Sequence, residues 1–161
     1  MKNWKRVEKY EDMSYLKFYF GKDYKFNRYF TYDVNKDGTP ELFLYSTTMG
    51  MTEVLTYKKG KIISLGYDDI YGIKKSKKAI IVEGHWHGSG GSGAEWTVYT
   101  IGKKKLRVKY SIDPMGTDGI TVNYKKASKS AYNKIYKSYV KGTTKLNKFK
   151  KYKLSNTKGL K

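Results

Sequence analysis

The chain has 161 residues, of which 34 are Lys or Arg and 14 are Asp or Glu, so its formal net charge is +20. It contains no cysteine, which excludes disulfide bonds, thiolate metal sites and thiol catalysis. Arginine occurs only at Arg6, Arg28 and Arg107, which argues against a protein that reads DNA bases through bidentate arginine contacts. The length suits one domain with its own core, so we expect residues 1–161 to form a single domain.

The positive charge is almost entirely lysine and is spread along the chain. Such a field suits a partner with repeated negative charge, such as a cell-wall polymer, a membrane surface or a nucleic-acid backbone. The alternative is that the charge serves solubility alone. No apolar run approaches the roughly 18 residues of a membrane-spanning helix, so we predict no membrane span.

The N-terminal half of the chain predicts one helix followed by several strands. Apolar and aromatic side chains recur at a loose helical spacing between Asn3 and Phe20, which predicts an N-terminal helix. The same region is basic and lacks the apolar segment of a secretory signal peptide, so we expect any export leader to precede it. NRYFTYD (27–33) and ELFLYS (41–46) predict two strands on either side of an acidic loop.

The middle of the chain predicts further strands. EVLTYKKGKIISLGY (53–67) predicts a hairpin that turns at Lys59-Gly60. AIIVEGHWH (79–87) predicts another strand, and EWTVYTIGKKKLRVKYSI (95–112) predicts two more that join at Gly102-Lys103. Together these segments predict an antiparallel meander of about six or seven strands.

The periodicity changes near Ser128, which is a favourable helix N-cap. Apolar side chains then repeat at a spacing of four, and Gly142 is placed to end the helix. Its tyrosines would close the core while lysines face water, or the two would form a stacking and charge surface.

The last part of the chain, about 143–161, is a basic tail in which Phe149, Tyr152 and Leu154 would dock as a short strand. The predicted fold class is therefore α+β, an antiparallel β-meander with an N-terminal and a C-terminal helix.

The stretch YDVNKDGTPELFLYS (32–46) concentrates oxygen-bearing side chains before Gly38, in a chain that has few acids. Alternate residues in a tight loop aim their oxygens at one point, and glycine permits the bend. A calcium ion would be held by Asp33, Asn35 and Asp37, the backbone carbonyl of Thr39 and the carboxylate of Glu41. The alternative is that the acids only cap a turn through Asx hydrogen bonds.

This loop is not an EF-hand, because Leu44 occupies the twelfth position and a strand follows. The pattern Asp-x-Asn-x-Asp-Gly-x-x-Glu resembles the calcium loop of integrin-type FG-GAP and related repeats. More closely, the loop, HGSGGSGAEWTVYTI and the YNKIYKSYVKG…KYKL ending resemble poorly characterised secreted domains and lipoproteins of Clostridia-like Gram-positive bacteria. The resemblance implies an extracytoplasmic location, at the cell surface or secreted, and a calcium site. It implies no catalytic residues.

A second constellation lies in VEGHWHGSGGSGAEW (82–96). On a strand Glu83, His85 and His87 share one face, and Glu95 would approach across a hairpin, so zinc binding or acid–base chemistry is a candidate role. The alternative is an exposed His-x-His pair without function. GSGGSG (88–93) predicts a flexible linker. The tryptophans beside it would pack in the core or offer a flat face to a sugar.

The sequence therefore predicts a non-enzymatic, extracytoplasmic calcium-binding module that contacts an anionic or glycan surface. A backbone-directed nucleic-acid-binding protein, using 128–141 and the basic tail, is a second hypothesis. A polysaccharide hydrolase that uses Glu83, His85, His87 or Glu95 is a third, although no nucleophile elbow or recognisable glycosidase spacing is present.

Overall fold

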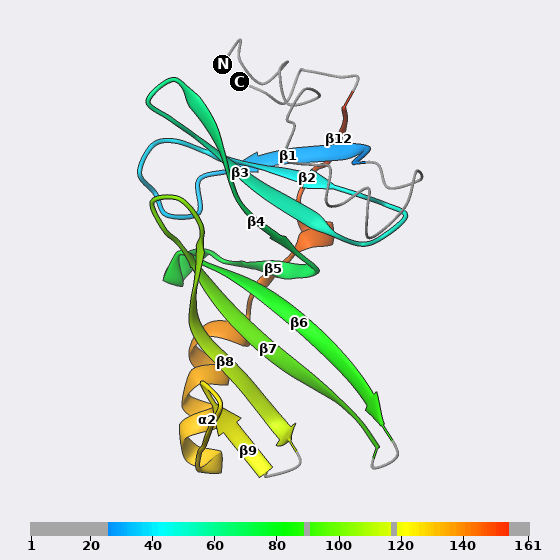
Figure 1. Ribbon diagram of the computed structural model, residues 1–161, viewed down its shortest axis with the longest axis vertical. Coiled ribbons are helices and arrows are strands. Elements are labelled where there is room, and N and C mark those ends of the chain that lie inside the picture. The colour runs from blue at the N-terminus through cyan, green and yellow to red at the C-terminus, as the bar shows by residue number, and fades with distance from the viewer. Residues whose placement is uncertain (1–25, 89–90, 117–118, 155–161) are drawn as a thin grey trace.

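The computed structural model describes residues 26–88, 91–116 and 119–154. Within these ranges the chain forms twelve strands, arranged as a five-stranded and a seven-stranded sheet, and one short α-helix (Figure 1). All strand pairs are antiparallel. The helix predicted for 3–20 lies outside the described residues.

The five-stranded sheet has the order β12-β1-β2-β3-β4. Its strands are β1 Arg28–Tyr32, β2 Glu41–Tyr45, β3 Thr52–Lys58, β4 Lys61–Asp68 and β12 Tyr152–Lys153. β2 lies in the centre and is buried along nearly its whole length, which explains its run of apolar residues. The predicted turn between β3 and β4 is confirmed, because Lys59 and Gly60 both have the positive φ of a tight hairpin.

The seven-stranded sheet has the order β10-β9-β8-β7-β6-β5-β11. Its strands are β5 Ile70–Lys74, β6 Ala79–Gly88, β7 Gly91–Ile101, β8 Leu106–Gly116, β9 Gly119–Val122, β10 Lys125–Lys126 and β11 Thr144–Lys145. The short 3-10 helix η3, Lys75–Lys77, connects β5 to β6. The flexible linker predicted for GSGGSG is wrong for Gly88 and residues 91–93, which belong to the paired strands β6 and β7. Residues 89–90 lie outside the described residues.

The α-helix α2, Lys129–Ile135, continues as a π-helical turn, η4, Tyr136–Val140. The hydroxyl of Ser128 accepts the N–H of Ala131 at 3.2 Å, which confirms the predicted N-cap. Gly142 follows the last turn with φ 73°, a backbone conformation that glycine adopts without strain.

Together α2 and η4 cover one face of the seven-stranded sheet (Figure 1). Trp96 of β7 packs edge-on against Tyr71 and Tyr136, at ring-centroid distances of 5.2 and 6.0 Å. This tryptophan is therefore a core residue, as one of the two alternatives for it expected.

The C-terminal segment adds one strand to each sheet. β11 pairs with β5, the 3-10 helix η5, Leu146–Lys148, follows, and β12 pairs with β1. The predicted short docked strand is confirmed at Tyr152, whereas Phe149 and Leu154 lie outside it. Within the described part of the tail, residues 144–153 thus connect the two sheets.

The core has three parts. Phe30 and Phe43 from the first sheet and Val34 from the loop between β1 and β2 meet Ile73 and Ile80 from the second sheet, so the sheets pack on each other through one apolar cluster. A second cluster lies on the other face of the five-stranded sheet, and a third lies between the seven-stranded sheet and α2. Within the described ranges no helix combines the length and apolar character needed to span a bilayer.

The predicted fold class is wrong. The described residues are mostly strand and form two packed sheets with one short helix, instead of one meander of six or seven strands between two helices. The misprediction has a physical cause. Side-chain periodicity identifies a strand but does not say which strands pair. The two-residue strands β11 and β12 form only through contacts with distant partners, and β10 is too short to show a period.

Candidate metal centre

The acidic loop joins β1 to β2 and is closed by the last rung of their ladder, in which Tyr32 pairs with Glu41. Residues 33–40 form the loop itself. Two of them, Lys36 and Gly38, have positive φ angles of 58° and 87°. The bend that the sequence predicted at Gly38 is therefore confirmed, because a φ of this size favours glycine.

Val34 anchors the loop to the core. Its side chain is 1% exposed and packs in the cluster between the two sheets. Its backbone N–H donates to Oε2 of Glu41 at 2.9 Å across the loop. One apolar contact and one buried hydrogen bond thus fix the inner side of the loop.

The outer side of the loop is organised by Asx-type hydrogen bonds. The two carboxylate oxygens of Asp33 accept the N–H groups of Asp37 and Gly38, at 3.1 and 2.9 Å. Oδ1 of Asn35 also accepts the Asp37 N–H at 2.9 Å, and Oδ1 of Asp37 accepts the Thr39 N–H at 2.9 Å. These bonds hold the three side chains over the loop, as the turn-capping alternative expected.

Glu41 sets this loop apart from a simple capped turn. Its side chain is completely buried, and while Oε2 accepts the N–H of Val34, Oε1 has no hydrogen-bond partner. Burial raises the pKa of Glu41 from 4.5 to about 7, and the nearby carboxylates of Asp37 and Asp33 also raise it. Buried polar atoms are almost always paired, so an unpaired carboxylate oxygen beside two more carboxylates calls for a cation or a proton.

The donor set fits a hard cation such as calcium. Calcium accepts carboxylate, amide and carbonyl oxygens, which are the groups that Asp33, Asn35, Asp37 and Glu41 present. A carboxylate oxygen that accepts one N–H keeps a lone pair for a metal. Among the described residues, no three His, Cys, Asp or Glu side chains already form a metal-ligating group. Binding would therefore draw these oxygens together.

The predicted ligands differ in their exposure. Asp33, Asn35 and Thr39 are partly buried, Asp37 is exposed and Glu41 is buried, so the loop runs from solvent to core across the candidate site. An ion bound here would exchange some of its water ligands for protein oxygens on the buried side of the loop and would keep water ligands on the solvent side.

The second predicted constellation is only partly assembled. Glu83 and His85 lie on one face of β6, with Oε2 of Glu83 3.7 Å from Nε2 of His85, and the His85 side chain is 61% exposed. The side chain of His87 lies outside the described residues. Glu95 pairs opposite Gly84 and lies against its backbone, so it occupies the other face of the sheet. The structure does not bring Glu95 to the Glu83–His85 pair.

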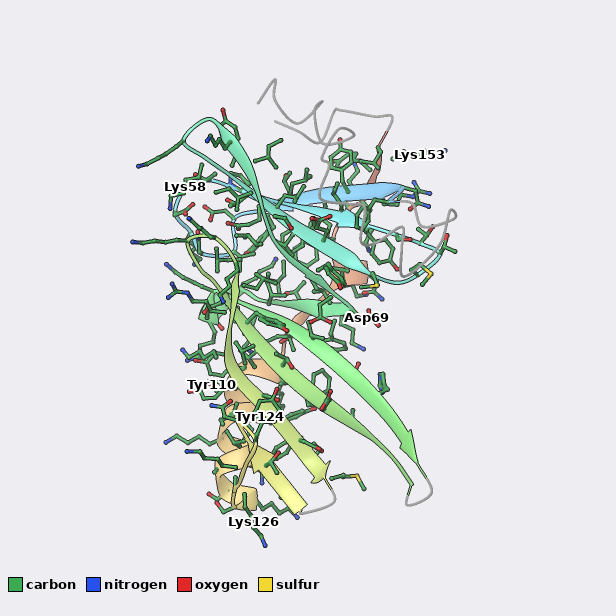
Figure 2. The ribbon with its side chains drawn as sticks, in the orientation of Figure 1. Lys58, Asp69, Tyr110, Tyr124, Lys126 and Lys153 are labelled. Atoms are coloured by element: carbon green, nitrogen blue, oxygen red, sulfur yellow. The ribbon has the colours of Figure 1, made fainter. Side chains whose placement is uncertain are left out.

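A polar cavity of about 210 Å³ adjoins the loop, and sequence reasoning missed it. Three turns meet there: the acidic loop, the β3–β4 hairpin and the β7–β8 turn (Figure 1). Its lining includes Asn35 and Asp37 from the loop, Tyr57 and Lys58 from β3, and Lys103 from the β7–β8 turn. Figure 2 shows Lys58 at the end of the molecule that holds the five-stranded sheet. Lys58 and Lys103 are 45 positions apart in the printed sequence, so no local pattern links them.

We compared the chain with protein-family models, curated proteins and solved structures and found no match in any of the three comparisons.

Proposed function

We propose that this protein is a non-enzymatic calcium-binding module that acts outside the cytoplasm, on a Gram-positive cell surface or secreted, and that it contacts an anionic surface. Calcium binds in the loop between β1 and β2, with Asp33, Asn35, Asp37, Thr39 and Glu41 as protein ligands. The remaining coordination positions take water.

The observation that carries this proposal is the buried carboxylate of Glu41. It has one unpaired oxygen, and the carboxylates of Asp33 and Asp37 are close enough to raise its pKa. A turn held together by Asx bonds alone needs no buried acid at its base. A divalent cation would satisfy the unpaired oxygen and neutralise the repulsion among the three carboxylates.

The ion would have a structural role. Asp33 follows β1 directly and Glu41 is the first residue of β2, so a shared cation links the ends of two central strands. Through Val34 the same loop is attached to the packing between the sheets. Calcium would therefore stabilise the contact of the two sheets as well as the loop.

The expected affinity fits an extracellular compartment. Lys36 lies within the loop and carries a positive charge close to the ligands, which weakens cation binding. We expect a dissociation constant in the range of extracellular calcium modules, about 10⁻⁴ to 10⁻³ M. A submicromolar constant would contradict the extracytoplasmic part of the proposal.

The test is a calcium titration followed by calorimetry and by the unfolding temperature. Calcium at about 100 times its dissociation constant should stabilise the protein by about 2.7 kcal/mol. Magnesium should stabilise it less, because it requires a near-ideal octahedral geometry and gives up its water ligands reluctantly. Asp33→Asn and Glu41→Gln should each abolish the calcium effect.

Asp113→Asn is the matched control, because it removes one negative charge from β8 and its side chain lies outside the loop. It should respond to calcium as the unchanged protein does. Absence of heat and of any rise in unfolding temperature at calcium concentrations up to about 100 times the expected dissociation constant would remove the metal from the proposal. An equal loss of response in Asp113→Asn would show that net charge, and not the loop, governs the effect.

A further inference from the structure

We propose that the cavity beside the acidic loop is a calcium-dependent subsite for one small anionic group, a phosphate or a carboxylate, which bridges the loop-bound ion and the ammonium groups of Lys58 and Lys103. This inference rests on the proposed calcium site and extends it from a structural site to a ligand-binding site.

The first observation is that loop and cavity share side chains. Asn35 and Asp37 belong to the predicted calcium ligands and also line the cavity. Calcium takes about six to eight oxygen ligands, and the loop supplies about five, so at least one position is open to another oxygen. The cavity adjoins the partly buried Asn35 and the exposed Asp37, whereas Val34 and Glu41 are buried and do not line it.

The second observation is the charge of the cavity walls. Lys58 comes from the end of β3 and Lys103 from the β7–β8 turn, so two different sheets each contribute a cation. In the described part of the chain, no carboxylate forms an ion pair with either lysine. Two ammonium groups and a divalent ion around one small cavity match an anion that carries several oxygen acceptors.

The third observation is the carboxylate of Asp37, which makes the site conditional. Without an ion, a negative Asp37 lines the cavity and opposes a negative ligand. Bound calcium offsets most of the negative charge of the loop and offers the anion an open coordination position. Anion binding should therefore require calcium, and by linkage the anion should tighten calcium binding by the same factor.

The fourth observation is size. The cavity measures about 210 Å³, below the roughly 300 to 1,000 Å³ of pockets that enclose drug-sized ligands. It suits one charged group with a short stem or a single sugar ring, which Tyr57 at the wall would contact. The cavity therefore holds one charged unit, free or at the end of a larger molecule, and not an extended chain buried along its length.

The experiment titrates glycerol 3-phosphate and, separately, glucuronate into the protein in calcium and in EDTA, with uncharged glycerol as the blank. We expect both anions or one of them to bind in calcium only, and the arm that responds identifies phosphate or carboxylate. The double substitution Lys58→Ala and Lys103→Ala should weaken anion binding by at least about tenfold and leave calcium binding in place.

The matched control is Lys125→Ala with Lys126→Ala, which removes the same charge from β10. Figure 2 shows Lys126 at the opposite end of the molecule from Lys58. This control should bind the anions as the unchanged protein does.

Four outcomes would overturn the inference. Calcium binding without anion binding, or an equal loss in both double variants, would remove the subsite and leave the calcium proposal intact. Equal anion binding in calcium and in EDTA would remove the bridge. Absence of calcium binding would overturn the calcium proposal and this inference together.

Discussion

Glu41 occupies a position where a carboxylate is costly. It is fully buried at the rung of the β1–β2 ladder that closes the loop, and only one of its oxygens is paired. A charged carboxylate in this place can be relieved in two ways, by taking up a proton or by binding a cation. The two compete, so calcium binding at a pH below about 7 should release a proton.

The raised pKa of Glu41 predicts a pH-dependent stability in the absence of calcium. The folded state holds a proton up to about pH 7, whereas the unfolded state releases it near 4.5. Stability therefore falls as the pH rises through this window, by at most about 3 kcal/mol, and stays at the lower level above it. Urea unfolding between pH 4 and 8 in EDTA measures this loss.

Glu41→Gln isolates the contribution of this one group, because the amide does not titrate. The unfolding free energy of the variant minus that of the unchanged protein should increase as the pH rises, so that the variant is relatively more stable above pH 7. Calcium should restore the stability of the unchanged protein at pH 7.5 and have no effect on the variant. A difference that is constant with pH would contradict the assignment.

At the scale of elements, the contact of β11 with β5 shows how the tail is held. Gly72 of β5 is buried and pairs with Lys145, and a Cβ at this position would clash with the backbone carbonyl of Thr144. Backbone atoms of a paired strand cannot move aside as a flexible side chain can. The absence of a side chain at Gly72 is therefore what lets the tail approach the sheet.

Gly72→Ala should detach β11 and destabilise the protein by about 1–3 kcal/mol, since the added methyl forces a backbone shift. Chemical denaturation measures the loss, and faster amide exchange at Lys145 would locate it. Ser76→Ala on the exposed helix η3 is the control, and it should stay within about 0.5 kcal/mol of the unchanged protein. Equal stability of both variants would show that the tail does not depend on this contact.

The N-cap of α2 provides a second test at this scale. Ser128→Ala removes the acceptor for the Ala131 N–H and should lower the unfolding free energy by about 1 kcal/mol. Ser130→Ala changes the same residue type inside the helix and should be neutral or stabilising by up to about 0.5 kcal/mol. Thermal unfolding of the two variants side by side separates the cap from helix propensity. Identical unfolding curves for the two variants would contradict the capping role.

At the scale of the whole molecule, the net charge of +20 creates a positive electrostatic field that comes almost entirely from lysine. The chain has too few arginines for an arginine-rich surface that recognises DNA bases. Several lysines lie over aromatic rings, as Lys109 does over Tyr139 at 5.2 Å and Lys145 over Tyr71 at 5.2 Å. Both tyrosines belong to the apolar cluster between the seven-stranded sheet and the helix, and each ring is covered by a lysine. The arrangement favours a charged surface over a row of aromatic rings free to stack on bases.

The charge predicts weak and unspecific binding to a long polyanion. Any affinity for duplex DNA at 50 mM salt should fall by about 10³-fold or more by 200 mM if several phosphates are contacted, and should not depend on sequence. Fluorescence anisotropy with two unrelated duplexes measures both properties. Tight, sequence-dependent binding at physiological salt would favour the nucleic-acid hypothesis over the proposed function.

Local chemistry determined much of this protein by itself. The β3–β4 turn followed from Lys59-Gly60, the helix start from Ser128, and the bend of the acidic loop from Gly38, because each depends on a few neighbouring backbone angles. The tertiary structure alone decided that the strands divide into two sheets, since pairing between distant segments leaves no trace in local periodicity. It also buried Glu41 and placed Lys58 near Lys103, because burial and proximity depend on contacts between residues far apart in the chain.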